Sequence, residues 1–323
     1  MKTNGQEAAP GPLKPAAYDM EPKRPGRAAR VFAALGKSAC YVGLFMGMQV
    51  LVMLPAMVYA AVVAAIAGGS EDEIYDAILS VDVMALTLIS GLLTIAVVLA
   101  FYLIRRKKLS EALWLRPVSK PALLTGMSLI PALYFVVILV LTALPASVTE
   151  NYEEASEGIA DGSIVTVISV VIVAPVVEEF IFRGLIMTRL SRAMPGWLAV
   201  LLSAAVFGMC HGEFVWFCYT FVLGAFFGFI DLRAGSILPS ILGHLVFNAI
   251  GQTMGFIPDG IGSLIALGVL FAAAIVFPIL NRKGIAALFR SRPALPATPV
   301  SDAKVEWDLP TVPGTYEFNP WEE

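Results

Sequence analysis

The stretch LTLISGLLTIAVVLAFYLI, residues 86–104, contains no Asp, Glu, Lys or Arg. Residues 122–146 and 261–280 form two further stretches without a charged side chain. An apolar run of about 18 residues or more is long enough to cross the hydrocarbon core of a bilayer, which is roughly 30 Å thick. The chain is therefore expected to cross a membrane several times.

The composition of the whole chain supports the same expectation. Of the 323 residues, 58% are hydrophobic and 15% are charged, and the mean hydropathy is +0.79. A soluble domain carries about a quarter charged residues, so this sequence cannot supply a polar shell around a core of buried helices. The three cysteines lie in apolar segments without metal-type spacing, and we interpret them as small buried hydrophobic residues.

Hydropathy predicts an all-α fold, a polytopic transmembrane helix bundle of about eight spans. The expected spans are residues 39–67, 82–104, 121–146, 164–190, 197–212, 215–232, 236–256 and 262–281. Basic residues follow the second, fourth, sixth and eighth spans, and acidic residues follow the other four. Because basic residues stay on the cytoplasmic side, both termini are expected in the cytoplasm and the protein in the inner cell membrane.

The two ends of the chain differ from the apolar spans. Their Pro-rich and, at the N-terminus, basic composition cannot bury apolar surface. We therefore predict disordered cytoplasmic tails around three membrane regions: N-terminal helices, a polar core and a last helix. In chain order the five regions are residues 1–35, 36–150, 151–256, 257–285 and 286–323. No internal repeat and no matched pair of broken spans is visible, which disfavours a secondary transporter.

Polar and ionisable residues gather in the fourth, fifth and seventh expected spans. The group includes both histidines of the chain and consists of Glu178, Glu179, Arg183, His211, His244 and Asn248. An ionisable residue inside a span costs about 2.5–3.5 kcal/mol on insertion scales and indicates a functional site. The first three spans are nearly free of such residues, so the candidate site is expected between residues 178 and 248.

The fourth span carries two adjacent carboxylates. Glu179 and Arg183 are four residues apart, so they share a helix face and can pair. Glu178 points about 100° away from Glu179 and has no partner in its own helix, which leaves it available to another group. Pro175 lacks an N–H and so frees a backbone carbonyl one turn earlier. The alternative interpretation is that these charges begin the cytoplasmic edge of the span, where long side chains reach water.

The seventh span carries a polar stripe with one residue every fourth position: Ser236, Ser240, His244, Asn248 and Gln252. Lipid cannot satisfy such a stripe, so it is expected to face the interior of the bundle or a wet cavity. Hydrogen bonding between helices, without chemistry, is the alternative for these groups. In the fifth span Phe207 and His211 are likewise four residues apart.

A carboxylate, two imidazoles and an amide are sufficient groups to hydrolyse an amide bond with water. In one hypothesis Glu178 is a general base and His211 orients the water, while His244 and Asn248 donate to the oxyanion. In the other, Glu178, His211 and His244 hold a catalytic zinc ion with an open fourth position. The sequence leaves open whether the protein needs no cofactor or one divalent metal.

Three short motifs that include the only two histidines resemble those of the CPBP family, also called Abi: Glu178-Glu179-x-x-x-Arg183, Phe207-x-x-x-His211 and His244-x-x-x-Asn248. Members of this family are CAAX-type prenyl endopeptidases and bacteriocin-processing or immunity proteins. The resemblance covers roughly residues 165–255. It implies an eight-helix membrane fold in which Glu178 and His211 activate water, His244 and Asn248 stabilise the oxyanion, and Glu179 and Arg183 are supporting residues.

The resemblance implies an endopeptidase that cuts near the C-terminus of its substrate. The expected partners are the lipid bilayer and a membrane-embedded or lipidated peptide, with a prenylated CAAX-type C-terminus as the family's substrate class. No nucleic-acid partner is expected. The alternative is a non-catalytic bacteriocin-immunity or membrane scaffold protein whose polar residues form a buried hydrogen-bond network.

One geometric conflict accompanies these predictions. Counting about 1.5 Å per residue from the span ends puts Glu178 nearer the cytoplasmic face and His211 nearer the outer face. The two side chains meet only if the fourth or fifth span is kinked, short or differently bounded. Pro175 and Pro195 allow such a distortion.

Overall fold

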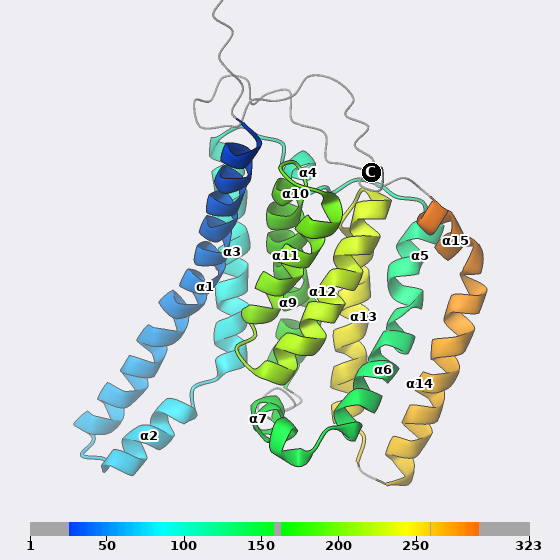
Figure 1. Ribbon diagram of the computed structural model, residues 1–323. Helices are drawn as coiled ribbons and strands as arrows, with labels where there is room; N and C mark the ends of the chain where they lie inside the picture. The colour runs from blue at the N-terminus through cyan, green and yellow to red at the C-terminus, as the bar shows by residue number, and fades with distance from the viewer. Residues whose placement is uncertain (1–25, 158–162, 259, 291–323) are drawn as a thin grey trace, which may run out of the picture.

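The computed structural model describes residues 26–157, 163–258 and 260–290 (Figure 1). In these ranges all regular structure is helical and no strand is present. The predicted all-α bundle is therefore confirmed.

Each expected span corresponds to one helix or to a run of helices. The first three are α1 (Arg27–Ile66), α3 (Val83–Ile104) and the broken pair α5 (Lys120–Ser128) and α6 (Ile130–Ala143). The fourth is built from α8 (Ile164–Val167), η1 (Ile168–Val173), α9 (Ala174–Glu178), η2 (Glu179–Met187) and α10 (Thr188–Leu190). The last four are α11 (Gly196–Met209), α12 (Phe214–Ala234), α13 (Leu238–Gly255) and α14 (Ile261–Leu280).

Six of these units are long and apolar enough to cross a membrane: α1, α3, α5–α6, α8–α10, α12 and α14. The other two are α11, which has only 14 residues, and α13, which carries the polar stripe. A polytopic membrane bundle is thus established. The count of eight spans and the cytoplasmic side of the termini stay predictions.

Two acidic segments that hydropathy predicts as loops form helices, α2 (Glu71–Leu79) and α7 (Ala146–Glu157). The start of α2 has a sequence signal, because Ser70 and Glu73 form a reciprocal capping box. The Glu73 carboxylate accepts from the Ser70 backbone N–H at 2.7 Å, and this bond lowers the pKa of Glu73 below its usual value. Two short helices, α4 (Leu109–Ala112) and α15 (Arg282–Arg290), complete the described fold.

The structure describes a part of each predicted disordered tail, and these parts are helical. Residues 27–35 belong to α1, and residues 286–290 belong to α15. The N-terminal turns of α1 are ordered by packing, since Ala34 is fully buried. The rest of both predicted tails lies outside the described residues.

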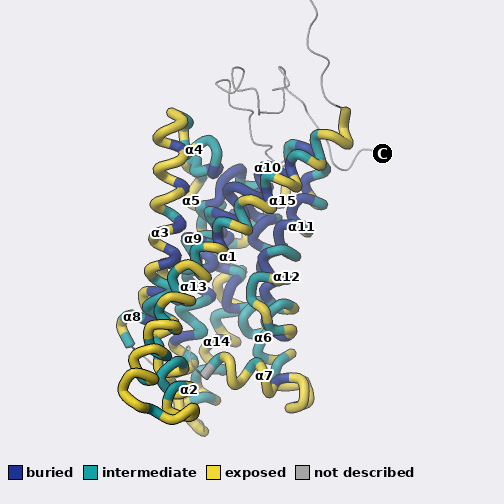
Figure 2. The backbone as a smooth tube through the Cα atoms, turned by 90° about the vertical axis from the view of Figure 1, so that its left-hand side faces the viewer, coloured by how far each residue is buried: buried dark blue, intermediate teal, exposed yellow. Residues whose placement is uncertain are grey.

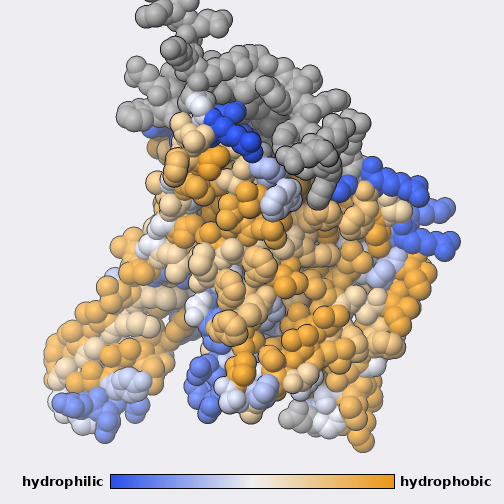
Figure 3. Space-filling model, in the orientation of Figure 1, coloured by the Kyte–Doolittle hydropathy of each residue, from blue (hydrophilic) through white to orange (hydrophobic). Residues whose placement is uncertain are grey.

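Charge separates the two ends of the bundle. The start of α1, together with α4, α10 and α15, lies at one end, and the acidic helices α2 and α7 lie at the other (Figure 1). Between the two hydrophilic ends the surface is mostly hydrophobic (Figure 3). The start of α1 and the end of α15 both lie at the basic end of the bundle (Figure 1).

Burial is concentrated in the second half of the chain. Buried residues gather in η2, α11, α12 and α13, whereas most of α14 is exposed and α1 has few buried residues (Figure 2). The backbones of α5 and α13 touch, because a Cβ on Gly243 would lie 2.7 Å from the carbonyl oxygen of Gly126. This close contact fixes the position of α13, the helix that carries the polar stripe.

Candidate active site

The fourth span changes its hydrogen-bond register on both sides of the two glutamates. In η1 the Ala174 N–H donates to the Ser169 carbonyl, five residues earlier. In this register the Val170 carbonyl would accept from residue 175, but Pro175 has no N–H. The Asn248 side-chain amide donates to that carbonyl instead, at 2.8 Å. The predicted free carbonyl is thus found, and its donor comes from α13.

The predicted pair of Glu179 and Arg183 is confirmed. Arg183 Nε lies 3.1 Å from Glu179 Oε2, and the two side chains are 1% and 0% exposed. The Arg183 guanidinium also lies over the Phe207 ring, with Cζ 4.3 Å from the ring centroid. A charge pair this deeply buried needs both members, because either one alone would be an uncompensated charge in a low-dielectric interior.

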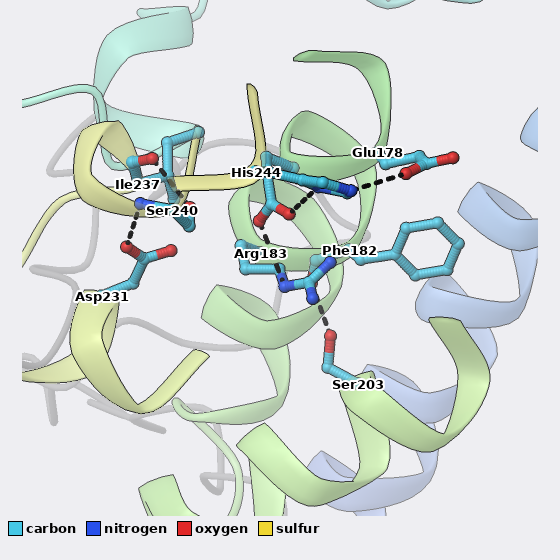
Figure 4. A network of polar contacts seen from close by, with 9 residues as sticks. Glu178, Phe182, Arg183, Ser203, Asp231, Ile237, Ser240 and His244 are labelled. Carbon is cyan, nitrogen blue, oxygen red and sulfur yellow. Dashed lines mark hydrogen bonds and ion pairs between the residues drawn. The ribbon is translucent and has the colours of Figure 1, made fainter. Parts of the chain in front are cut away.

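His244 lies between the two glutamates of the fourth span (Figure 4). Its Nδ1 is 2.8 Å from Glu179 Oε1, and its Nε2 is 3.7 Å from Glu178 Oε2. Because Glu179 is held as a carboxylate by Arg183, the Nδ1–H donates to it. Nε2 is then the ring nitrogen available to Glu178 and to anything bound beside it.

Glu178 is the accessible carboxylate of the pair, with 16% of its side chain exposed. Within the described residues, its one ion contact is with His244.

His211 lies directly after α11 and points toward its own helix. Its Nδ1–H donates to the Phe207 carbonyl at 2.9 Å, so Nε2 is the free ring nitrogen. The Phe207 ring lies near both imidazoles, with its centroid 4.8 Å from that of His211 and 6.0 Å from that of His244. The expected contact of Glu178 with His211 is not among the contacts of the described residues. His244 contacts Glu178 instead, and the catalytic roles of both histidines stay predictions.

The short α11 resolves most of the predicted depth conflict. Its 14 residues span about 21 Å at 1.5 Å per residue. The turn after it lies inside the height of the bundle, before the level at which α1 and α14 end (Figure 1). The fifth span predicted from hydropathy continues to residue 212, and this extension puts His211 too close to the outer face.

The residues proposed as zinc ligands do not meet. Across residues 26–157, 163–258 and 260–290, no group of three or more His, Cys, Asp or Glu side chains is arranged to hold a metal ion. Glu178 and His244 face each other, but no contact joins His211 to either of them. The set Glu178, His211 and His244 does not fit a metal site in this arrangement, and we derive no step through a metal.

The predicted polar stripe, with Ser236 in the turn before α13 and the other four residues on α13, faces the interior of the bundle. Ser236, Ser240, His244 and Gln252 are buried, and Asn248 is half-buried. Ser236 Oγ donates to the Arg116 carbonyl at 2.8 Å. The prediction that this stripe avoids lipid is therefore confirmed.

Asp231 is a buried acid that the sequence reasoning missed. It lies near the end of α12, is fully buried, and accepts from the Ser240 backbone N–H at 3.2 Å. A signal was present in the sequence, since Asp231 is flanked by Ile230 and Leu232 inside an expected span. The expected span 215–232 includes Asp231, but the sequence analysis did not count it among the ionisable residues of the spans.

A buried cluster of carboxylates, an arginine and an imidazole inside an apolar helix bundle defines a membrane protein with an enzyme-like polar site. Residues 160–250 match a family model described as Rce1-like, type II CAAX prenyl endopeptidase Rce1-like. This match confirms the resemblance to the CPBP family over the segment that holds every candidate residue, and it supports an intramembrane protease. No curated protein and no solved structure matches the chain.

Proposed function

We propose that the chain is an intramembrane endopeptidase that uses Glu178 to activate water against a peptide bond of a membrane-associated substrate. The observation that supports this most is the approach of Glu178 Oε2 to His244 Nε2, at 3.7 Å, in an otherwise buried polar cluster. The match to a prenyl endopeptidase family over the same residues supports the reaction type.

The geometry of the pair suits a bound water molecule. The 3.7 Å separation exceeds an ordinary hydrogen bond of about 2.7–3.2 Å, so a water beside the pair can reach both atoms. Glu178 takes a proton from this water as its oxygen attacks the substrate carbonyl carbon. The same proton passes to the leaving amine nitrogen when the tetrahedral intermediate collapses.

His244 is oriented as a donor to the developing oxyanion. Its Nδ1–H is fixed on Glu179, and Glu179 is fixed by Arg183. A carboxylate behind an imidazole sets the tautomer of the ring and stabilises the imidazolium. In the proposed mechanism His244 carries a proton on Nε2 before the water attacks, and this Nε2–H donates to the developing oxyanion throughout the step. Glu178 alone takes the proton of the water and passes it on.

His211 and Asn248 complete the proposed mechanism. We assign to His211, whose Nε2 is the ring nitrogen not bonded to its own helix, the role of orienting the attacking water as the substrate enters. Asn248 uses one amide hydrogen on the Val170 carbonyl. Its Nδ2 carries two hydrogens, so the second is available to the oxyanion. No cofactor enters this mechanism.

For the substrate we propose a membrane-embedded or lipidated peptide, with a C-terminally prenylated CAAX-type peptide as the first class to test. The name of the matched family refers to such a substrate. A site between apolar helices also favours a peptide that is already in the membrane, because such a peptide needs no transfer from water. We propose the inner cell membrane as the location.

A non-catalytic scaffold or immunity protein is the second candidate. It is favoured by the buried contacts among Glu179, Arg183 and His244 and by the bond of Asn248 to a helix carbonyl. Each of these contacts also stabilises a fold without any chemistry. Glu178 separates the two candidates, because it is the most accessible member and has the fewest structural contacts.

Quantitative mapping of protein termini in membranes tests the proposal while the substrate is still unidentified. Four strains are compared: wild type, a deletion, and the deletion carrying Glu178→Gln or Glu111→Gln. The matched control Glu111 is an exposed acid paired with Lys108 far from the site. New termini are expected with the wild type and Glu111→Gln only. If Glu178→Gln at equal abundance restores the same termini, hydrolysis through Glu178 is excluded.

A further inference from the structure

Asp231 is the one buried carboxylate near the site that the proposed mechanism leaves without a role. It is 0% exposed, and its Oδ1 accepts from the Ser240 N–H at 3.2 Å (Figure 4). Its Oδ2 is buried and has no hydrogen-bond partner among the described residues. Burying such a group costs free energy, so we expect interactions of Asp231 that offset this cost.

The first of these interactions is with the start of α13. The N-terminal N–H groups of a helix have no partner within the helix, and the N-cap residue Ile237 has no side chain that accepts. The Leu238 N–H donates to Ser236 Oγ at 3.3 Å, and Pro239 has no N–H. The Ser240 N–H therefore needs an acceptor, and α12 supplies the Asp231 carboxylate at the positive end of the helix.

The second interaction is at the side chain of the same residue. Ser240 Oγ donates to the Ile237 carbonyl at 2.8 Å. Ser240 is therefore held by its backbone N–H on Asp231 and by its hydroxyl on the preceding turn.

Both interactions affect the position of the His244 side chain. Ser240 precedes His244 by four residues, so the anchored N–H and the imidazole lie on one face of α13, one turn apart. The loop from α12 to α13 is short, and Gly235 closes α12 with a left-handed φ of 67°. A shift of the first turn of α13 would therefore move the His244 ring relative to Glu178 and Glu179.

We propose that Asp231 is a positioning residue: it anchors the first turn of α13 and thereby holds the His244 ring against both glutamates. Only the catalytic consequence of this placement rests on the proposed protease function. The placement itself is a property of the folded chain and can be measured without any substrate.

The direct test is ring ¹⁵N NMR of histidine-labelled protein in lipid nanodiscs, purified with a tag that contains no histidine. The chain has only two histidines, and a His211→Asn variant assigns their signals. Asp231→Leu removes the acceptor of the Ser240 N–H, and Asp231→Asn keeps a carbonyl oxygen that can accept from it. Thr220→Val is the control, since Thr220 is another buried polar residue on α12 and bonds only its own helix.

Asp231→Leu is expected to shift the His244 signals and its tautomer populations and to leave those of His211 in place. Asp231→Asn is expected to shift the same signals by a smaller amount, and Thr220→Val to shift neither set. If Asp231→Leu does not fold, Asp231→Asn decides the question. His244 signals that equal the wild type in the folded variants would overturn the proposal.

A cleavage assay adds the catalytic consequence. With the peptide identified by terminus mapping, Asp231→Leu is expected to lower kcat by about 100-fold, because small displacements of a reacting group cost about this much, and to leave KM nearly unchanged. An unchanged kcat would contradict a positioning role even if the His244 signals move. If the wild type cuts no peptide, the proposed protease function is wrong. The NMR experiment still tests the positioning role of Asp231, because it needs no substrate.

Discussion

The consecutive helices α13 and α14 are of similar length, 18 and 20 residues, but they turn opposite kinds of side chain toward the bundle. In α13 the buried residues include Ser240, His244 and Gln252, whereas in α14 only Leu270 is buried. The apolar side chains of α14 face outward, where lipid solvates them as well as a protein core would. In this pair of helices, therefore, polar side chains mark the face that packs in the interior, and hydrophobicity alone does not.

The comparison of α13 with α14 also predicts which substitutions lower the free energy of unfolding most. Four side chains of the stripe have a hydrogen-bond partner: Ser236, Ser240, His244 and Asn248. Removing His244 or Asn248 therefore leaves a group on the fourth span unsatisfied. Side chains of α14 have few protein neighbours. The following predictions test this difference from the largest expected effect to the smallest.

Arg183→Leu is expected to lower the free energy of unfolding by about 3–5 kcal/mol, because it leaves buried carboxylates without their cation. Reversible unfolding in mixed lipid and detergent micelles measures the change. The matched control is Lys108→Leu, which breaks an exposed pair with Glu111 and should cost less than about 1 kcal/mol. Equal costs for the two variants would show that the Arg183 cluster is no more than a surface pair.

Gly224→Val is expected to destabilise the fold by about 1–3 kcal/mol through overpacking. A Cβ at this position would lie 3.0 Å from Arg183 Nη2 and 3.1 Å from Phe207 Cδ1. In α14, a Cβ on Gly268 would meet nothing within 4 Å, so Gly268→Val is the control with the same change in side chain. Unfolding of both variants at the same denaturant concentration would contradict the claim that Gly224 is more tightly packed than Gly268.

Asn248→Leu is expected to cost about 1–2 kcal/mol, because the Val170 carbonyl loses its donor. Pro175→Ala supplies a backbone N–H in the register of η1, so the same Asn248 substitution should cost less in that background. The two single variants and the double variant form a cycle that isolates this coupling. Additive free energies would mean that Pro175 and Asn248 act independently.

Removal of divalent metals is expected to change cleavage by less than about twofold, since the described donors do not form a three-ligand site. The assay compares protein dialysed against a strong chelator with the same protein after zinc is restored. Loss of cleavage on chelation and recovery with zinc would show that the histidines rearrange around a metal during the reaction.

The sequence predicted the parts of the structure that depend on local patterns. Hydropathy located the apolar helices, including the fourth span from residue 164 to 190, and the four-residue spacings predicted the Glu179–Arg183 pair and the inward stripe of α13. The acidic helices α2 and α7 were missed because a short charged segment between spans was assumed to be a loop. The signal of the Ser70 and Glu73 capping box was available and unused.

Contacts between helices were harder to predict. The sequence could not tell which histidine meets Glu178, because that depends on how far α11 extends and on the π-helical turns around Glu179. Nor could it show that Asn248 satisfies the carbonyl freed by Pro175, although each half of that bond was recognised. Asp231 was overlooked because its partner, the start of α13, is defined only once α12 and α13 pack together.

The measurement that tests the central claim most directly is single-turnover cleavage of the mapped substrate in H₂¹⁸O by wild type and by Glu178→Gln, both in lipid vesicles. The wild type is expected to place one ¹⁸O atom in the new C-terminal carboxylate. Glu178→Gln should retain its fold and cut slower by about 1,000-fold, the order expected for loss of a general base. Cleavage by Glu178→Gln at nearly the wild-type rate would contradict the role of Glu178 as the base that activates water.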